Sequence, residues 1–141
     1  MRSHSRTIMG VCFLAPLVLF GCGMSAGVAL GKAAVDEFHT RYNAAQYDAI
    51  YDAADPEWRS AMDRETSRKF FERVHRKLGS CSKTTNTGYV YNTTTGGTFV
   101  NLHYTATCSN GTLEEDFRIK LEGQKGLVLA YTANSPLLLT D

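Results

Sequence analysis

Apolar and polar side chains alternate through the segment 99–108. Alternation with a period of two is typical of a β-strand that has one buried face. The set that we expect to be buried is Val100, Leu102, Tyr104, Ala106 and Cys108. An Asn110-Gly111 pair follows this strand and is typical of a hairpin turn. Folding the chain about this pair predicts that Tyr104 lies opposite Phe117, Leu102 opposite Ile119 and Val100 opposite Leu121.

A second hairpin is predicted before this strand. The run Thr93-Thr94-Thr95-Gly96-Gly97 suits a loop. Folding about Thr94 and Thr95 places Tyr91 opposite Thr98, Tyr89 opposite Val100 and Cys81 opposite Cys108. A last turn at 123–126 returns the chain into a strand at 127–133. The pattern therefore predicts four antiparallel strands in meander order.

Helical periodicity fills the chain before Cys81. Four helical segments are expected, at about 32–45, 46–54, 57–62 and 66–78. Val35, Phe38, Tyr42 and Ala45 share one face of the first segment, and Gly79 is placed to end the last. Asp55-Pro56 separates the second segment from the third, because a residue before proline avoids helical geometry. The chain is predicted to be a single α+β domain, with N-terminal helices packed on one face of the sheet.

The N-terminus has the layout of an export signal. Arg2 and Arg6 precede an uncharged apolar run from Ile8 to Phe20. The sequence Leu19-Phe20-Gly21-Cys22 then resembles the end of a bacterial lipoprotein signal. That resemblance implies a signal peptide over 1–21, a lipidated Cys22, and a lipoprotein that faces the periplasm from a membrane, most simply the outer one. The small residues of Gly23–Gly31 are expected to form a flexible tether over 22–31.

An uncleaved transmembrane helix is the alternative for this segment. No charge occurs between Arg6 and Lys32, so 7–31 is long enough to span a bilayer. Pro16 and five glycines argue against it. In both interpretations the domain is exported and is anchored to the membrane at its N-terminus.

The cysteine count supports export. Cys12 would leave with the signal and Cys22 would carry lipid, so Cys81 and Cys108 remain as a pair in an oxidising compartment. A disulfide between them would stabilise the fold by about 3–4 kcal/mol in the chain-entropy model. Two buried free thiols are the alternative. The spacing does not fit a redox CxxC pair or a zinc site.

Three local motifs are similar to small bacterial NTF2-like (cystatin-like) lipoproteins, over about 32–139. The stretch Tyr42-Asn43-Ala44-Ala45-Gln46-Tyr47-Asp48-Ala49-Ile50-Tyr51 resembles their helix pair. Phe70-Phe71 with Leu78-Gly79 resembles the end of their third helix, and the segment 131–137 resembles their closing strand. Ala130 stands where glycine is frequent in that family, and 127–129 holds leucine and valine where tryptophan is common. The resemblance implies a curved sheet whose cone-shaped space, facing the helices, holds ligands in some members.

Aromatic side chains could line such a cone. The candidate ligand pocket consists of Tyr42, Trp58, Tyr89, Tyr104, Glu115 and Phe117. The alternative is that these rings only fill the core. Glu115 is expected on the inward face with Phe117, near a sheet end that solvent reaches. An enzyme of this fold needs a buried Asp or His facing a Tyr, and the sequence alone does not place one.

Other charged groups suggest no chemistry. His39, His75 and His103 lack metal-ligand spacing and are expected on the surface or at rims, so neither a metal nor a cofactor is predicted. One face of the last helix carries a basic cluster of Arg68, Lys69, Arg73, Arg76 and Lys77. It is either a solvated face or a site for an acidic partner or lipid headgroups. Without the signal the chain holds 13 basic and 14 acidic residues, which gives no reason to expect nucleic acid.

The sequence therefore predicts a non-catalytic, membrane-anchored cell-envelope module that binds a partner protein or a small ligand. A small-molecule binder or enzyme that uses the cone is the alternative. The oligomeric state is left open, with a dimer among the options.

Overall fold

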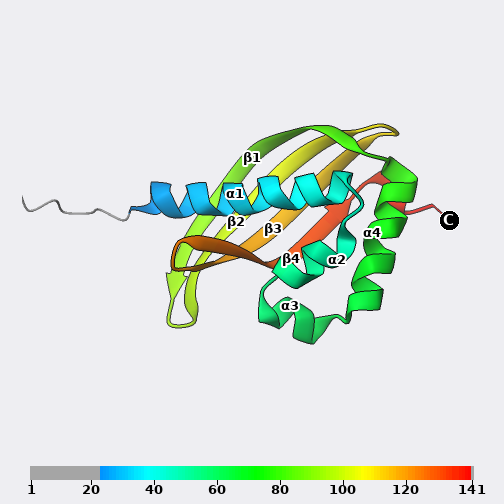
Figure 1. Ribbon diagram of the computed structural model, residues 1–141. Coiled ribbons are helices and arrows are strands. Elements are labelled where there is room, and N and C mark those ends of the chain that lie inside the picture. The colour runs from blue at the N-terminus through cyan, green and yellow to red at the C-terminus, as the bar shows by residue number, and fades with distance from the viewer. Residues whose placement is uncertain (1–22, 141) are drawn as a thin grey trace, which may run out of the picture.

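The computed structural model describes residues 23–140 of the chain. The signal peptide and the lipidation of Cys22 lie outside the described residues and stay predictions. The described chain is an α+β domain with four helices before a four-stranded sheet (Figure 1). The helices are α1 (Met24–Asn43), α2 (Tyr47–Ala53), α3 (Pro56–Ala61) and α4 (Arg64–Leu78). A short 3₁₀ turn, η1 (Pro136–Leu138), follows the last strand.

Helix α1 begins eight residues earlier than the sequence predicted, and this corrects the expected tether. The segment from Met24 to Gly31 is helical. A Cβ atom on Gly27 would lie 2.7 Å from the Tyr91 ring, and one on Gly31 would lie 3.2 Å from Leu102 Cδ1. The glycines that suggested flexibility therefore let the helix lie close against the sheet. The first turns of α1 are part of the packed domain.

The other helices begin and end at side chains that the sequence provides. Asp55 accepts a hydrogen bond from the backbone N–H of Glu57 at 2.8 Å and caps α3, while Asp63 accepts one from Thr66 at 2.9 Å and caps α4. Gly79 has a φ of 75° and ends α4, as predicted.

The sheet is an open antiparallel meander in the order β1-β2-β3-β4. The strands are β1 (Cys81–Thr94), β2 (Gly97–Cys108), β3 (Thr112–Glu122) and β4 (Lys125–Asn134). Figure 1 shows α1 lying across the inner face of the sheet, with α2, α3 and α4 grouped beside β4. No helix of the described residues is long and apolar enough to cross a membrane.

The register of the first hairpin differs from the prediction near its turn. Tyr91 lies opposite Val100 and Tyr89 opposite Leu102, two residues away from the predicted pairs. Two register shifts, between Asn86 and Gly88 and between Cys81 and Lys83, remove this offset along the hairpin. The pairing of Cys81 with Cys108 is therefore confirmed, and the two form a disulfide.

The second hairpin is also displaced by two residues from the prediction. Tyr104 pairs with Glu115, Leu102 with Phe117 and Val100 with Ile119. A displacement by an even number leaves every side chain on its predicted face of the sheet. The inward set from Val100 to Cys108 is buried, as expected.

Candidate functional site

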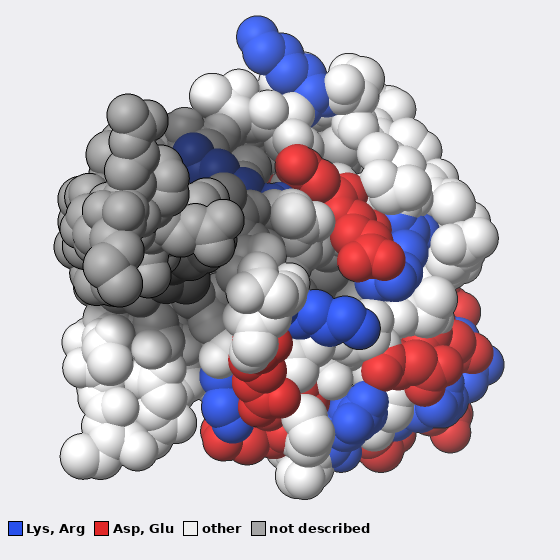
Figure 2. All heavy atoms as spheres, turned by 60° about the vertical axis from the view of Figure 1, so that its left-hand side comes forward, with Lys and Arg blue, Asp and Glu red and all other residues white. Residues whose placement is uncertain are grey.

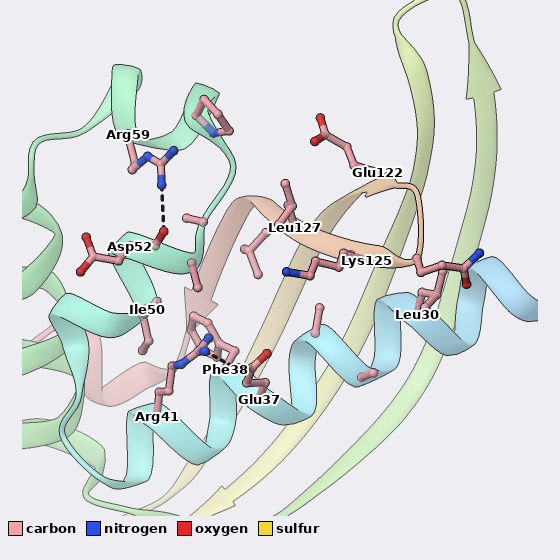
Figure 3. Close-up of a pocket in the computed structure, with 18 residues that line it drawn as sticks. Leu30, Glu37, Phe38, Arg41, Ile50, Asp52, Arg59, Glu122, Lys125 and Leu127 are labelled. Carbon is pink, nitrogen blue, oxygen red and sulfur yellow. Dashed lines mark hydrogen bonds and ion pairs between the residues drawn. The ribbon is translucent and has the colours of Figure 1, made fainter.

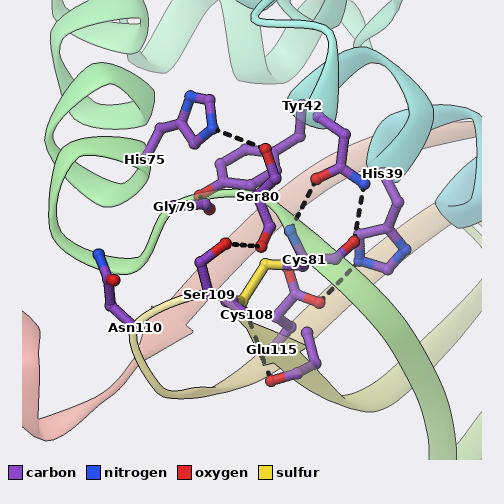
Figure 4. Close-up of a disulfide and its surroundings, with 12 residues drawn as sticks. His39, Tyr42, His75, Gly79, Ser80, Cys81, Cys108, Ser109, Asn110 and Glu115 are labelled. Atoms are coloured by element: carbon purple, nitrogen blue, oxygen red, sulfur yellow. Dashed lines mark hydrogen bonds and ion pairs between the residues drawn. A yellow bond between two sulfur atoms is a disulfide. The ribbon is translucent and has the colours of Figure 1, made fainter.

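The disulfide end of the sheet is tied to the C-terminus of α1 (Figure 4). Asn43 donates a hydrogen bond from Nδ2 to the carbonyl of Cys81 and accepts one at Oδ1 from the N–H of Cys81, both at 2.9 Å. The Tyr42 hydroxyl donates to the carbonyl of Gly79 at 3.1 Å. These contacts and the disulfide fix this end of the sheet to α1 and to the junction between α4 and β1.

Five of the six candidate pocket residues lie in the interior. Tyr42, Trp58, Tyr104, Glu115 and Phe117 are buried. Tyr89 corrects the prediction, because 47% of its surface is exposed. It lies on the edge strand β1, opposite Leu102, where it does not join the other five.

Aromatic rings occupy the space between α1 and the sheet. The Phe38 ring lies 5.0 Å from that of Phe117 and 4.8 Å from that of Tyr131, measured between centroids. Phe71 lies 5.6 Å from Phe38, and Trp58 stacks on Phe71 at 6.3 Å. Edge-to-face and stacked pairs at these distances are typical of a packed aromatic core. The described aromatic side chains therefore pack the interior between the helices and the sheet.

A polar cluster crosses this interior, consisting of the buried His39 and Glu115 and the partly buried Tyr131. Glu115 Oε2 accepts a hydrogen bond from His39 Nε2, and Glu115 Oε1 accepts one from the Tyr131 hydroxyl, each at 2.7 Å. The exposed fractions of His39 and Glu115 are 7% and 3%. Because a buried carboxylate is costly without partners, the two donors are needed to hold Glu115 inside.

The cluster corrects two expectations from the sequence. His39 was expected at the surface or a rim, and Glu115 near a solvent-exposed sheet end. His39 lies on the face of α1 that packs against the sheet, and Glu115 pairs with the buried Tyr104 on β2. Within the described residues, His39 is the buried histidine that the sequence could not place, and its ring lies 5.7 Å from that of Tyr104, measured between centroids.

Burial also raises the pKa values of two tyrosines near Glu115, Tyr131 and Tyr104. Burial and then the Glu115 charge raise the pKa of Tyr131 well above its usual value. Burial, with smaller contributions from Asp36 and Glu115, raises the pKa of Tyr104 to about 12. Both hydroxyls therefore stay protonated at neutral pH and can donate hydrogen bonds, whereas neither can serve as a base.

An open cleft of about 570 Å³ lies apart from the polar cluster, among α1, the α2–α3 segment and the turn between β3 and β4 (Figure 3). We call it the α1–α2–β4 cleft. The cleft is open because small residues line much of it, namely Ala33, Ala34, Ala53, Ala54 and Gly126. Larger apolar groups contribute to the floor, including Leu30, Phe38, Ile50, Leu127 and Val128. The sequence reasoning missed this cleft, because its walls come from three distant segments.

The rim of the cleft is charged and largely paired. Glu37 forms an ion pair with Arg41, and Arg59 donates to the carbonyl of Asp52 at 2.8 Å. Hydrogen bonding from Arg64 is the main cause that lowers the pKa of Asp52 below its usual value. Figure 2 shows acidic and basic side chains alternating over the described part of one face. Such a rim suits a polar border around an apolar contact.

The residues lining the cleft include no histidine, cysteine, serine, threonine or tyrosine. Carboxylates and lysines also serve in general acid–base and nucleophilic catalysis, and the lining supplies Glu37, Asp52, Glu122 and Lys125. Hydrogen bonding lowers the pKa of Asp52, which favours its ionised form. The described lining therefore offers apolar contact bordered by charged groups.

The basic cluster on α4 is mostly paired within the molecule. Arg68 forms an ion pair with Asp48 at 3.2 Å and Lys69 with Glu65 at 2.7 Å. Arg73 and Lys77 donate to the carbonyls of Leu138 and Thr140. Arg76 has no such partner among the described residues. The pairing weakens the case for this face as a site for an acidic partner.

The remaining histidines lie away from the cleft and from the polar cluster. His75 bonds to Tyr47, and His103 pairs with Asp116 on the outer face of the sheet. Residues 23–140 contain no group of three or more metal-ligating side chains. No family model and no curated protein matches the chain.

Proposed function

We propose that the protein is a non-catalytic module of the cell envelope, anchored at its N-terminus, that binds a partner protein through the α1–α2–β4 cleft. The anchor and the location rest on the sequence of the first 22 residues. The observation that carries the binding role is the contrast between the two sites. In the polar cluster His39 and Glu115 are buried and Tyr131 is partly buried, while the accessible cleft has an apolar floor and a charged rim.

A partner protein suits this cleft better than a small polar substrate. The floor offers apolar contact, and the rim carries Glu37, Asp52 and Glu122 together with Arg41, Arg59 and Lys125. An apolar centre with a mixed polar border is typical of protein interfaces. The occupant would insert one or two apolar side chains over the alanines of the floor.

Filling the cleft tests this proposal. Ala33→Trp, on the exposed side of α1, places an indole in the cleft, whereas Ala29→Trp adds the same ring one turn earlier, outside the lining. A photo-crosslinking amino acid at position 127 in the full chain should trap a partner in intact cells. Ala33→Trp should remove that product and Ala29→Trp should keep it. If both variants behave alike, or if position 127 traps no protein, the partner role of the cleft is wrong.

A second candidate function is a small-molecule binder or enzyme in the cone, and the His39–Glu115–Tyr131 cluster favours it. His39 Nδ1 is buried without a hydrogen-bond partner among the described residues, and a ligand would reach this nitrogen only if the aromatic rings around it moved apart. A crystallographic screen with small aromatic fragments separates the two functions. Fragments beside His39 would support the cone, and fragments over Ala33 and Leu127 would support the cleft. A turnover that depends on Glu115 would refute the non-catalytic proposal.

A further inference from the structure

Among residues 23–140, nothing covers the outer edge of β1, whereas α3 covers part of the edge of β4. The sheet is open, so β1 and β4 are both edge strands. At β4, the backbone N–H of Asp55 donates to the carbonyl of Val128 at 2.9 Å, and α3 packs beside it. Within residues 23–140, no backbone hydrogen bond other than those to β2 involves β1 between Gly88 and Thr94. This half of β1 runs along the side of the sheet in Figure 1 with no helix outside it.

The uncovered edge also lacks the usual protection against pairing. Natural edge strands carry charged side chains, prolines or a covering element, because an open row of backbone groups pairs with other strands. The segment 84–102 contains no Asp, Glu, Lys, Arg or Pro. Tyr89 and Val90 are 47% and 55% exposed, and they are two of the four large apolar residues exposed in the described chain.

The regular part of β1 is long enough for a further strand. Both register shifts precede Gly88, and from Gly88 to Thr94 the strand pairs with β2 without interruption. Seven residues is the length of an ordinary strand. The edge therefore has an uninterrupted register where it is most apolar.

We propose that a second copy of this chain pairs with it through β1, antiparallel, with the two-fold axis at Val90. A two-fold contact sets each strand against its own sequence, so any charge in it would lie near a like charge. The absence of charge from 84–102 removes this repulsion. A different partner protein would gain from complementary charges, which this edge does not offer.

The side chains match under this symmetry. Val90 lies opposite the partner's Val90 on the outer face. Tyr89 lies opposite the partner's Tyr91, and this contact occurs twice. Tyr89 and Tyr91 share the inner face with Leu102 and Val100. Aromatic pairs directly across two antiparallel strands are favourable.

The expected dimer has one continuous eight-stranded sheet. A contact through one strand edge buries little surface, so we expect a dimer that dissociates on dilution. The dimer contact leaves the α1–α2–β4 cleft free, because no residue of β1 lines the cleft and its strand residues come from β3 and β4. The dimer and the partner-binding role are therefore tested independently.

Engineered cysteines test the register. Residues directly opposite in an antiparallel pair bring their Cβ atoms to about 4.5–5.5 Å, which a disulfide can bridge with little adjustment. The full chain in detergent, treated with a mild oxidant, should form at least tenfold more covalent dimer as Val90→Cys than as Thr132→Cys, which lies on the outer face of β4. Tyr89→Cys should remain near the Thr132→Cys level, because it faces the partner's Tyr91. The wild-type chain gives the background from its own cysteines.

A charge on the edge provides the second test. In sedimentation experiments, Val90→Lys should shift the monomer–dimer equilibrium at least tenfold toward monomer. Thr132→Lys adds the same charge on β4, at the opposite edge of the sheet from β1, and should leave the equilibrium unchanged. Both positions are exposed, so both variants should fold. The proposal is wrong if Val90→Cys forms no more covalent dimer than Thr132→Cys, if Val90→Lys dimerises like wild type, or if Val90→Cys is crosslinked to a different protein.

Discussion

At the scale of single residues, Glu115 is a buried carboxylate that depends on two hydrogen-bond donors. It lies 76 positions from His39 in sequence, and its two oxygens accept one hydrogen bond each. A charged group at 3% exposure remains favourable only while both donors stay in place. The cluster therefore fixes α1, β3 and β4 relative to one another.

Glu115→Gln should lower the free energy of unfolding by about 1–3 kcal/mol, because the amide keeps the shape but leaves one donor without its charged acceptor. Urea unfolding followed by circular dichroism measures this change. Glu114→Gln is the matched control, since Glu114 is exposed and bonds only to Thr105 among the described residues. The control should stay within about 0.5 kcal/mol of wild type. Equal losses in the two variants would contradict the structural role of the cluster.

Tyr131 should make the fold sensitive to alkaline pH. Its pKa is raised in the folded state, so the unfolded chain loses this proton first. The stabilisation is full below about pH 10 and falls by about 1.4 kcal/mol per pH unit above it, until the folded tyrosine also ionises. Tyr131→Phe removes this titration. Its unfolding free energy should decline less steeply than that of wild type between pH 10 and 11, while the two curves stay parallel from pH 7 to 9. Equal slopes above pH 10 would refute the assignment.

At the scale of elements, glycines decide how closely α1 lies on the sheet. A Cβ atom on Gly126 would lie 2.8 Å from Ile119 Cγ2 and 3.0 Å from the carbonyl oxygen of Leu30. The second of these atoms belongs to the α1 backbone and cannot rotate away. The close contact between α1 and β4 therefore requires a glycine, which has no Cβ atom, at position 126.

Gly126→Ala should destabilise the domain by about 1–3 kcal/mol, because α1 must move away from β4. Thermal unfolding measures this loss. Gly96→Ala is the matched control, since its Cβ would meet no atom closer than 3.6 Å and its loop is exposed. A Gly126→Ala domain as stable as the control would show that α1 can shift without cost.

At the scale of the whole molecule, the early start of α1 shortens the expected linker between Cys22 and the folded domain. Only Gly23 separates Cys22 from the helix that begins at Met24. If Cys22 carries lipid, the domain has no flexible spacer between membrane and fold. The N-terminal end of α1, with Gly27 against Tyr91, would then be held close to the bilayer surface.

Cys22→Ser tests this anchor directly. The variant should lose incorporation of radiolabelled palmitate and should keep the unprocessed mass, because the signal resembles one that is cut before a lipidated cysteine. Cys12→Ser lies inside the same signal and should be processed normally. A Cys22→Ser chain with the same mass and membrane association as wild type would favour the uncleaved transmembrane helix instead.

The sequence by itself determined the helix order, the meander, the disulfide pair and the faces of the strands, because each follows from local periodicity and turn chemistry. Only the tertiary structure decided the site. His39, Glu115 and Tyr131 meet because α1 crosses β3 and β4, and no local pattern encodes that crossing. The cleft likewise needs three distant segments. The sequence did not predict the helical start of α1 for the same reason. Glycines in a local sequence suggest a flexible segment, and only the packed structure shows that Gly27 and Gly31 let the helix lie close to the sheet.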